Sequence, residues 1–197
     1  LVNEFVRSGI QEVAGHIYVD DTYFDQVRFD KDREDVRVDR AYDAPVGAMS
    51  FNWNSINVFV RPGKKVGDPV VVYADPQSKY IQVENQAVTG KGRVKTIRVS
   101  RTKSTNGIGN KITVRGALGI RREEVVKYKS ITQPDYWSGL HLKAFLERRG
   151  IKVSGKVKKG EVNTSTDQLQ ADYVNKEVSR SVADMMKFSN NYVAEML

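Results

Sequence analysis

The sequence lacks cysteine, has few histidines and contains no long apolar run. Without cysteine there are no disulfides and no thiol chemistry. The two histidines, His16 and His141, are far apart and have no metal-ligand spacing around them, so we expect neither a metal site nor a cofactor. No segment approaches the roughly 18–20 apolar residues of a membrane-spanning helix, and no signal-peptide pattern stands at the start. We therefore predict no transmembrane segment.

The composition is typical of a folded chain, with 40% hydrophobic and 28% charged residues. A helical pattern already begins at Leu1 and another stops at Leu197, so we expect the 197 residues to be a segment of a longer chain. The net charge of +8 indicates an acidic partner, which could be nucleic acid, anionic lipid or an anionic cell-wall polymer. Charge alone does not choose between them.

The N-terminal third of the chain mixes helical and strand patterns. Apolar spacing predicts a helix over residues 1–9, and alternation predicts a strand over 12–21. Residues 25–45 are rich in charge and weakly periodic, which indicates a surface loop. The acidic residues of this loop are irregularly spaced, so we do not expect them to form a metal site. Residues 46–63 read as strand, turn and strand.

From Gly63 to about Ile131 the pattern is that of β-structure throughout. Short apolar-alternating segments are separated by Gly, Asn, Asp or Pro at close spacing, which predicts a small all-β module. The glycines of "TGKGRVK", residues 89–95, do not have the spacing of a phosphate-binding loop, so we interpret them as a turn.

The C-terminal third returns to mixed structure. Residues 134–150 begin with Pro-Asp and end with Arg-Arg-Gly, which predicts a helix. Two short strands are expected over 151–162, a linker over 163–168 and helical structure over 169–197. A β module between mixed α/β pieces suggests one domain inserted into another.

The β module carries many basic residues, which makes nucleic-acid binding an alternative function. The basic side chains that could line such a groove are Arg98, Arg101, Lys103, Arg115, Arg121, Arg122, Lys127 and Lys129. Binders of single strands also need aromatic stacking platforms, and residues 81–127 contain no Phe, Tyr or Trp. We therefore expect no nucleic acid among the partners.

Ser189, Asn190 and Asn191, the Ser-Asn-Asn corner, interrupt the last helical pattern. Such residues are ordinary helix N-caps, since their side-chain oxygens accept free N–H groups of the first turn. A Ser-x-Asn element between two helices is also one of three motifs of penicillin-recognising serine enzymes, beside an S-x-x-K helix and a K-T-G strand. By itself the match has little weight.

A wider resemblance gives the corner its meaning. The chain resembles the class C low-molecular-mass penicillin-binding proteins, the D-alanyl-D-alanine carboxypeptidase/endopeptidase family. The segments that carry the resemblance occur in the family's order and fill about half of the chain: "EVAGHIYVDDTYFD", "YDAPVGAMSFNWNSINVFVRPG", "YWSGLHLKAFLERRGIKVSGKV" and "MMKFSNNYVAEML". The middle residue of the corner is Asn190, where Asp is usual in the family.

The family's other two motifs are missing from the sequence. It contains no K-T-G, and its one S-x-x-K, from Ser100 to Lys103, runs from a predicted strand into a turn rather than at the start of a buried helix. We therefore expect no nucleophile within these residues. We also expect the remaining segments of the polypeptide to be needed for activity, so that this fragment alone is inactive.

The resemblance implies a mixed α/β (α+β) fold with nested insertions. Residues 1–25 and 163–197 would be parts of the catalytic domain, 26–62 and 132–162 an inserted α/β domain, and 63–131 a nested all-β domain. The implied activity is that of a serine D,D-peptidase of peptidoglycan metabolism, with the peptide stem as substrate and β-lactams as inhibitors. The implied location is periplasmic or extracytoplasmic.

The resemblance also assigns roles to individual residues. Ser189 would relay a proton and hydrogen-bond the missing lysine, and Asn191 would clamp the substrate amide, with Asn190 a bystander. Asp20, which ends a Gly-x-x-x-x-Asp strand, would recognise the amino group of a diaminopimelate-like side chain, although Asp21 could take its place. The alternative to the enzyme is a non-catalytic basic β-domain protein that binds polyanions such as nucleic acid or cell-wall polymer.

Overall fold

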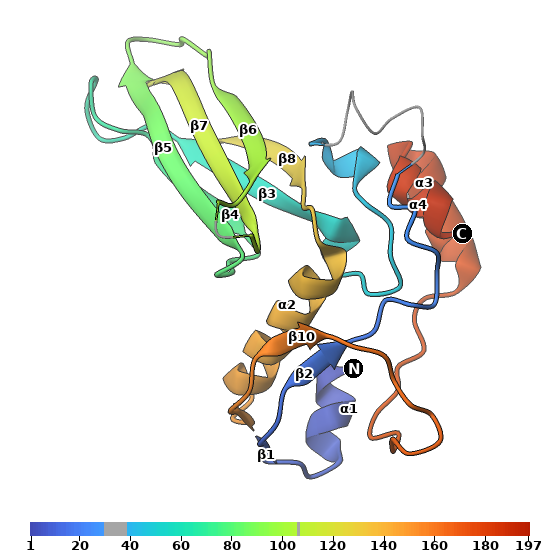
Figure 1. The fold of residues 1–197 in the computed structure, drawn as a ribbon. Helices are drawn as coiled ribbons and strands as arrows, with labels where there is room; N and C mark the ends of the chain where they lie inside the picture. Colours follow the sequence, from blue (N-terminus) through green and yellow to red (C-terminus); the bar gives the residue numbers. More distant parts are fainter. Residues whose placement is uncertain (30–38, 106) are drawn as a thin grey trace.

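A computed structural model of the chain describes residues 1–29, 39–105 and 107–197. It contains helices and several small sheets, and the predicted mixed α/β class is confirmed (Figure 1). The predicted acidic loop at Asp30 to Asp35 lies outside the described residues. None of the helices in the described part combines the length and apolarity that a membrane crossing needs.

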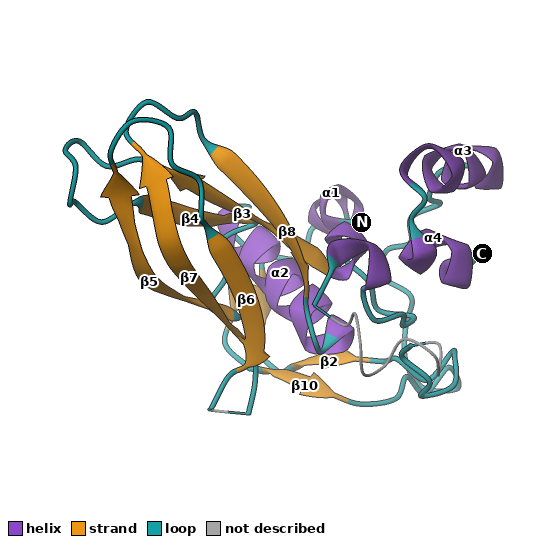
Figure 2. Cartoon of the chain, turned by 90° about the horizontal axis from the view of Figure 1, so that it is seen from above, coloured by secondary structure: helices purple, strands orange, loops and turns teal. Residues whose placement is uncertain are grey.

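The β module consists of two three-stranded sheets that face each other as two layers (Figure 2). The strands of the first sheet, in the order β4-β3-β8, are antiparallel: β4 (Val71–Asp75), β3 (Ser55–Arg61) and β8 (Val125–Ser130). The second sheet has the order β5-β7-β6, with β5 (Ile81–Gly90) parallel to β7 (Asn110–Gly119) and β6 (Arg98–Lys103) antiparallel to β7. The predicted series of short strands over 63–131 is confirmed.

The core of the module lies between the two sheets. Alternation along the strands directs branched aliphatic side chains inward, and these are fully buried: Ile56, Val58, Val60, Ile112, Val114 and Leu118. β3 precedes residue 63 and yet pairs with both β4 and β8. The domain boundary near residue 63 remains a prediction, and the first sheet extends across it.

Helix α2 (Pro134–Arg148) closes one end of the module, and this predicted helix is confirmed. Its Trp137 is fully buried and donates its indole N–H to the carbonyl of Phe51, 2.9 Å away. His141, one turn later, stacks on the ring of Phe51 with 4.6 Å between ring centroids. Burial holds the pKa of His141 below its ordinary value of 6.5. The ring of His141 packs between those of Phe51 and Trp137.

The N-terminal segment packs on α2 through short parallel ladders. α1 (Val2–Arg7) is confirmed, but the strand predicted over 12–21 is split into β1 (Glu12–Val13) and β2 (Ile17–Val19). β1 pairs with β9 (Lys152–Val153) and β2 with β10 (Val157–Lys159). The break occurs where two glycines meet, since a Cβ on Gly155 would lie 2.0 Å from the carbonyl oxygen of Gly15.

Two further sequence predictions are wrong. Residues 46–51 form no strand, and the Asn52–Asn54 turn that follows holds three non-glycine residues at φ of 53°, 52° and 47°. Residues 169–177 are not helical; the C-terminal helices are α3 (Val178–Phe188) and α4 (Asn191–Met196). In 169–177 nearly every side chain is exposed, so no packing stabilises a helix there.

Candidate active site

The Ser-Asn-Asn corner lies between α3 and α4. Asn190 occupies the N-cap position of α4: its side-chain oxygen accepts the N–H of Val193 at 3.3 Å, and the residue is buried. Ser189 ends α3 in the left-handed region, at φ 48° and ψ 46°, and is exposed. Its hydroxyl makes no hydrogen bond with any other described residue. The capping role is thus filled by Asn190, which leaves the side chains on either side of it available for other contacts.

Asn191 is oriented by a partner distant in sequence. Its Nδ2 donates to Oδ1 of Asp43 over 2.7 Å, and Asp43 is only 3% exposed, in the short 3-10 helix Ala41–Asp43. This hydrogen bond fixes which way the half-buried amide of Asn191 faces. Sequence reasoning missed Asp43. The available signal was its position at the start of the Ala-Pro block that carries part of the family resemblance.

A small apolar cluster holds the corner in place. Ala44 packs with Tyr192 and Val193 of α4, and Val46, Met185 and Met196 surround them. Burial raises the pKa of the Tyr192 hydroxyl. The exposed ring of Trp53, in the left-handed turn, lies 6.1 Å from that of Phe188 between centroids. Two of the segments that carry the resemblance, the one that contains Ala44 and the one that contains Tyr192, therefore contact each other in the fold.

Asp20 is half-buried and has local hydrogen-bond partners. Its Oδ1 accepts from the backbone N–H and the hydroxyl of Thr22, at 2.9 and 2.7 Å, and its Oδ2 accepts the N–H of Val162 at 2.8 Å. The Val162 hydrogen bond, with those of Thr22, lowers the pKa of the Asp20 carboxyl. Within the described residues no hydrogen bond joins Asp20 to Ser189 or Asn191. The carboxylate ties the end of β2 to the segment after β10.

Asp21 has a different environment from its neighbour. It is buried, pairs with Arg28, and accepts the N–H of Met49 at 3.0 Å. Arg28 in turn donates to the carbonyl of Val46 at 2.9 Å. Asp21 therefore fastens the 46–49 segment, whereas the carboxylate of Asp20 is the less buried of the two.

The literal S-x-x-K lies on β6, and Ser100 and Lys103 are both exposed there. Residues three apart on a strand point to opposite faces of the sheet. The lysine is therefore not positioned to activate the serine. This geometry agrees with the rejection of Ser100 as nucleophile.

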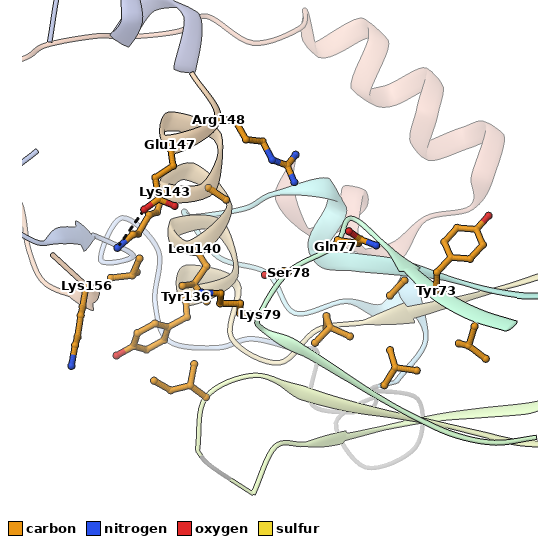
Figure 3. A pocket seen from close by; sticks show the side chains of 17 residues that line it. Tyr73, Gln77, Ser78, Lys79, Tyr136, Leu140, Lys143, Glu147, Arg148 and Lys156 are labelled. Atoms are coloured by element: carbon orange, nitrogen blue, oxygen red, sulfur yellow. Dashed lines mark ion pairs between the residues drawn. The ribbon is translucent and has the colours of Figure 1, made fainter. Parts of the chain in front are cut away.

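A groove with a volume of about 870 Å³ lies elsewhere, between α2 and the edge strands β4 and β5 (Figure 3). Its floor is apolar, and basic side chains including Lys79, Lys143 and Arg148 line it. Lys143 contacts Glu147 over 3.8 Å and donates to the carbonyl of Gly155 over 2.6 Å. Neither the corner residues nor Asp20 line this groove.

Comparison with known proteins gives matches over the whole chain. The sequence profile of the D-Ala-D-Ala carboxypeptidase 3 (S13) family matches residues 1–197. A D-alanyl-D-alanine carboxypeptidase of Actinomadura sp. (strain R39) is 32% identical over 203 residues, which cover 98% of this chain and 37% of that protein. The chain therefore spans little more than a third of the length of this relative.

Solved structures show the same fold. Penicillin binding protein 4 (dacB) of Haemophilus influenzae matches with a TM-score of 0.77 at 19% identity, over 98% of this chain and 42% of that one. The same protein complexed with a β-lactam matches with a TM-score of 0.66 at 20% identity, over 98% of this chain and 39% of that one.

Proposed function

The chain belongs to the D-Ala-D-Ala carboxypeptidase 3 (S13) family, and we propose that the complete protein is a serine D,D-peptidase of peptidoglycan metabolism. As a carboxypeptidase it would remove the terminal D-alanine of peptide stems, and as an endopeptidase it would cleave a peptide bond beside D-alanine. The complete protein would have one of these activities or both. β-Lactams would acylate it as inhibitors. It would work outside the cytoplasmic membrane, where peptidoglycan lies.

One observation carries the assignment of Ser189 and Asn191. Asn190 alone satisfies the N-cap of α4, so the fold does not need its two neighbours for capping. The hydroxyl of Ser189 is exposed, and the amide of Asn191 is held by Asp43. An exposed hydroxyl and a fixed amide on either side of a buried cap suit a site in which a peptide must be both bound and protonated.

The proposed chemistry is acyl transfer in two steps. A serine on a segment outside these residues attacks the carbonyl of the penultimate D-alanine while its neighbouring lysine takes the serine proton. The hydroxyl of Ser189 passes a proton to the leaving amine as the peptide bond breaks, and the Asn191 amide orients the substrate backbone. Water then releases the acyl group and regenerates the serine.

The remaining assignments follow the family arrangement. Asp20 would bind the side-chain amino group of a diaminopimelate-like residue through its carboxylate. Residues 26–62 and 132–162 would form an inserted domain, and 63–131 a nested one. These domains position the two catalytic-domain pieces in the chain without contributing catalytic groups.

The test is covalent labelling of the complete protein with a fluorescent penicillin, followed by mapping of the adduct by mass spectrometry. We expect one adduct, on a serine outside residues 1–197, and release of D-alanine from a peptide that ends in D-Ala-D-Ala. The 197-residue chain alone should remain unlabelled. A stoichiometric adduct on Ser100 or Ser189 would overturn the assignment of the nucleophile.

A further inference from the structure

Three loops meet at the end of the β module opposite α2 (Figure 1). They follow β3, β5 and β7 and are joined to one another by backbone hydrogen bonds. The N–H of Gly67 donates to the carbonyl of Thr89 at 2.9 Å, and those of Ile120 and Arg121 donate to the carbonyls of Gly90 and Gly92, each at 3.0 Å. This end of the module is remote from the Ser-Asn-Asn corner in both overall views.

Each loop carries the same kind of tripeptide: two basic residues and one aliphatic residue. The three are Lys-Lys-Val at 64–66, Arg-Val-Lys at 93–95 and Ile-Arg-Arg at 120–122, which together we call the basic tip. All six basic residues are exposed. Within the described residues none of them forms an ion pair, and the carboxylate of nearby Asp68 accepts the backbone N–H of Lys65 instead.

The aliphatic members of the basic tip also face solvent. Val66 is 47% exposed, Val94 38% and Ile120 37%. Binding of a soluble polyanion needs the basic groups alone and gains nothing from exposed aliphatic side chains. A lipid surface uses both, because aliphatic groups enter the boundary between headgroups and acyl chains while Lys and Arg pair with anionic headgroups.

The loops are also preorganised by their backbone. Gly67 and Gly92 adopt φ of 95° and 58°. A Cβ on Gly119 would lie 2.4 Å from the carbonyl oxygen of Gly92, so the second and third loops approach more closely than side chains permit. Binding would therefore order little backbone, and more of the interaction energy would appear as affinity.

We propose that the basic tip is a peripheral docking site for the surface of a membrane that contains anionic lipid. The site is independent of the peptidase chemistry proposed above. It holds the β module against the lipid through six basic side chains and three shallowly inserted aliphatic ones.

The first test measures binding of the full chain to vesicles of phosphatidylcholine with about one third phosphatidylglycerol, and to vesicles of phosphatidylcholine alone. We expect binding to the former only, weakened by salt. Lys64→Glu with Lys65→Glu should lower the partition coefficient at least about 30-fold, since each basic residue near such a surface contributes about a factor of five.

The matched control reverses the same charge at the other end of the module. Lys79 and Lys103 are exposed there; Lys103 pairs with Asn110, whose N–H donates to the carbonyl of Tyr80. Lys79→Glu with Lys103→Glu should change vesicle binding less than about threefold, because the surface potential decays within a Debye length. No binding to the anionic vesicles, or equal losses in both double variants, would overturn the proposal.

The second test separates a membrane from a soluble polyanion, with inorganic polyphosphate as the probe. Val66→Ser with Ile120→Ser should weaken vesicle binding about fivefold or more and leave polyphosphate binding unchanged. Val83→Ser with Ile108→Ser removes two equally exposed aliphatic groups near α2 and should affect neither. If the Val66 and Ile120 changes leave vesicle binding intact while Lys64→Glu with Lys65→Glu weakens both ligands alike, the tip is a polyanion site and not a lipid one.

Discussion

The Ser-Asn-Asn corner and the basic tip are both turns with polar surfaces, but they are held in opposite ways. At the corner, side chains fix the geometry: Asn190 caps α4, and Asp43 holds Asn191. At the tip, backbone hydrogen bonds and glycines fix the geometry, Arg122 donates from its side chain to the carbonyl of Arg93 at 2.7 Å, and the aliphatic and basic residues are exposed. A catalytic group must be positioned by its neighbours, whereas a surface that binds a fluid layer needs only the right side chains on a firm backbone.

The difference predicts which substitutions matter in each region. Truncating a polar side chain at the corner should lower the acylation rate or the stability, because we assign a catalytic, positioning or capping role to each of these groups. The tip should tolerate truncation without loss of stability, since surface substitutions usually change it by less than about 0.5 kcal/mol. What the tip should not tolerate is an added methyl group where two backbones touch.

The largest effect is expected at the corner. Ser189→Ala or Asn191→Ala in the complete protein should slow acylation by penicillin about a hundred- to thousand-fold, because loss of one positioned catalytic donor typically costs that much. Stopped-flow acylation kinetics measure the change. Thermal unfolding should be nearly unaltered in Ser189→Ala, since no hydrogen bond among the described residues is lost.

Unchanged acylation in both alanine variants would reduce the corner to a helix cap. It would also remove the contrast with the tip, because neither region would then contain a side chain whose exact placement matters for chemistry.

At the tip the largest effect is expected from Gly119→Ala. The new Cβ would lie 2.4 Å from the carbonyl oxygen of Gly92 and 2.7 Å from the backbone nitrogen of Val94, so the two loops would have to separate. We expect a destabilisation of about 2 kcal/mol, in the range of other overpacked sites. Urea unfolding measures it, with Gly15→Ala as control, since Gly15, like Gly119, does not have a positive φ but has open space around its Cβ position. Equal destabilisation in both variants would trace the effect to the loss of a glycine as such and not to loop contact.

The β module was largely predictable because its signals are local. Period-two alternation and turn residues mark each strand, and α2 carries its own start and stop residues. The order of the strands was not predictable: β5 and β6 are joined by a short loop, yet β7 lies between them. That order depends on contacts between distant segments. The strand predicted over 12–21 was split for the same reason, since Gly155 meets Gly15 across the fold.

The candidate site shows the same limit. Ser189, Asn191 and Asp20 came from family resemblance, and their catalytic and binding roles remain predictions. The resemblance marked both segments that form the corner but not that they touch. Asp43 therefore escaped notice, because its contact with Asn191 joins residues 148 positions apart.

Asp43 gives the next prediction. It accepts a hydrogen bond from Asn191, so we expect it to act as a positioning residue. Asp43→Ala should slow acylation about tenfold or more, because a hydrogen bond to a charged partner is lost and the Asn191 amide is free to turn. Asp43→Asn keeps an acceptor oxygen and should restore most of the rate. If Asp43→Asn is as slow as Asp43→Ala, the carboxylate charge matters rather than its hold on Asn191.

Asn190 separates structure from chemistry within the corner. Asn190→Ala removes the cap of α4 and should destabilise the protein by about 1 kcal/mol. Asn190→Asp keeps a capping oxygen and should be nearly silent in both stability and acylation, as expected of a bystander. Thermal melts and acylation rates of the two variants measure these effects. A large fall in acylation in Asn190→Asp, at unchanged stability, would give this residue a catalytic part.

The smallest effect concerns Asp20, whose pKa lies below its ordinary value of 3.8 because Val162 and Thr22 donate hydrogen bonds to the carboxylate. A carboxyl with a lowered pKa in the folded state stabilises the protein above the pKa of the unfolded state, and this stabilisation is lost as pH falls through the folded-state pKa. Replacing the carboxylate with a neutral amide should therefore lower stability by a constant amount above about pH 5. The gap between the native protein and Asp20→Asn should begin to shrink below about pH 4, where the carboxyl of the unfolded state takes up a proton before that of the folded state does. Urea unfolding of both proteins across this range measures the gap, with Asp25→Asn as the control, since Asp25 is exposed and accepts one local backbone hydrogen bond. A gap that persists unchanged at low pH would show that the shape of the carboxyl group matters and not its charge.

Asp20 also has a proposed substrate role, which needs its own readout: in the complete protein, Asp20→Asn should slow hydrolysis of a peptide with a free side-chain amine more than that of its acetylated form. If both peptides slow equally, Asp20 only ties β2 to the segment after β10, and the corner is the better supported part of the site.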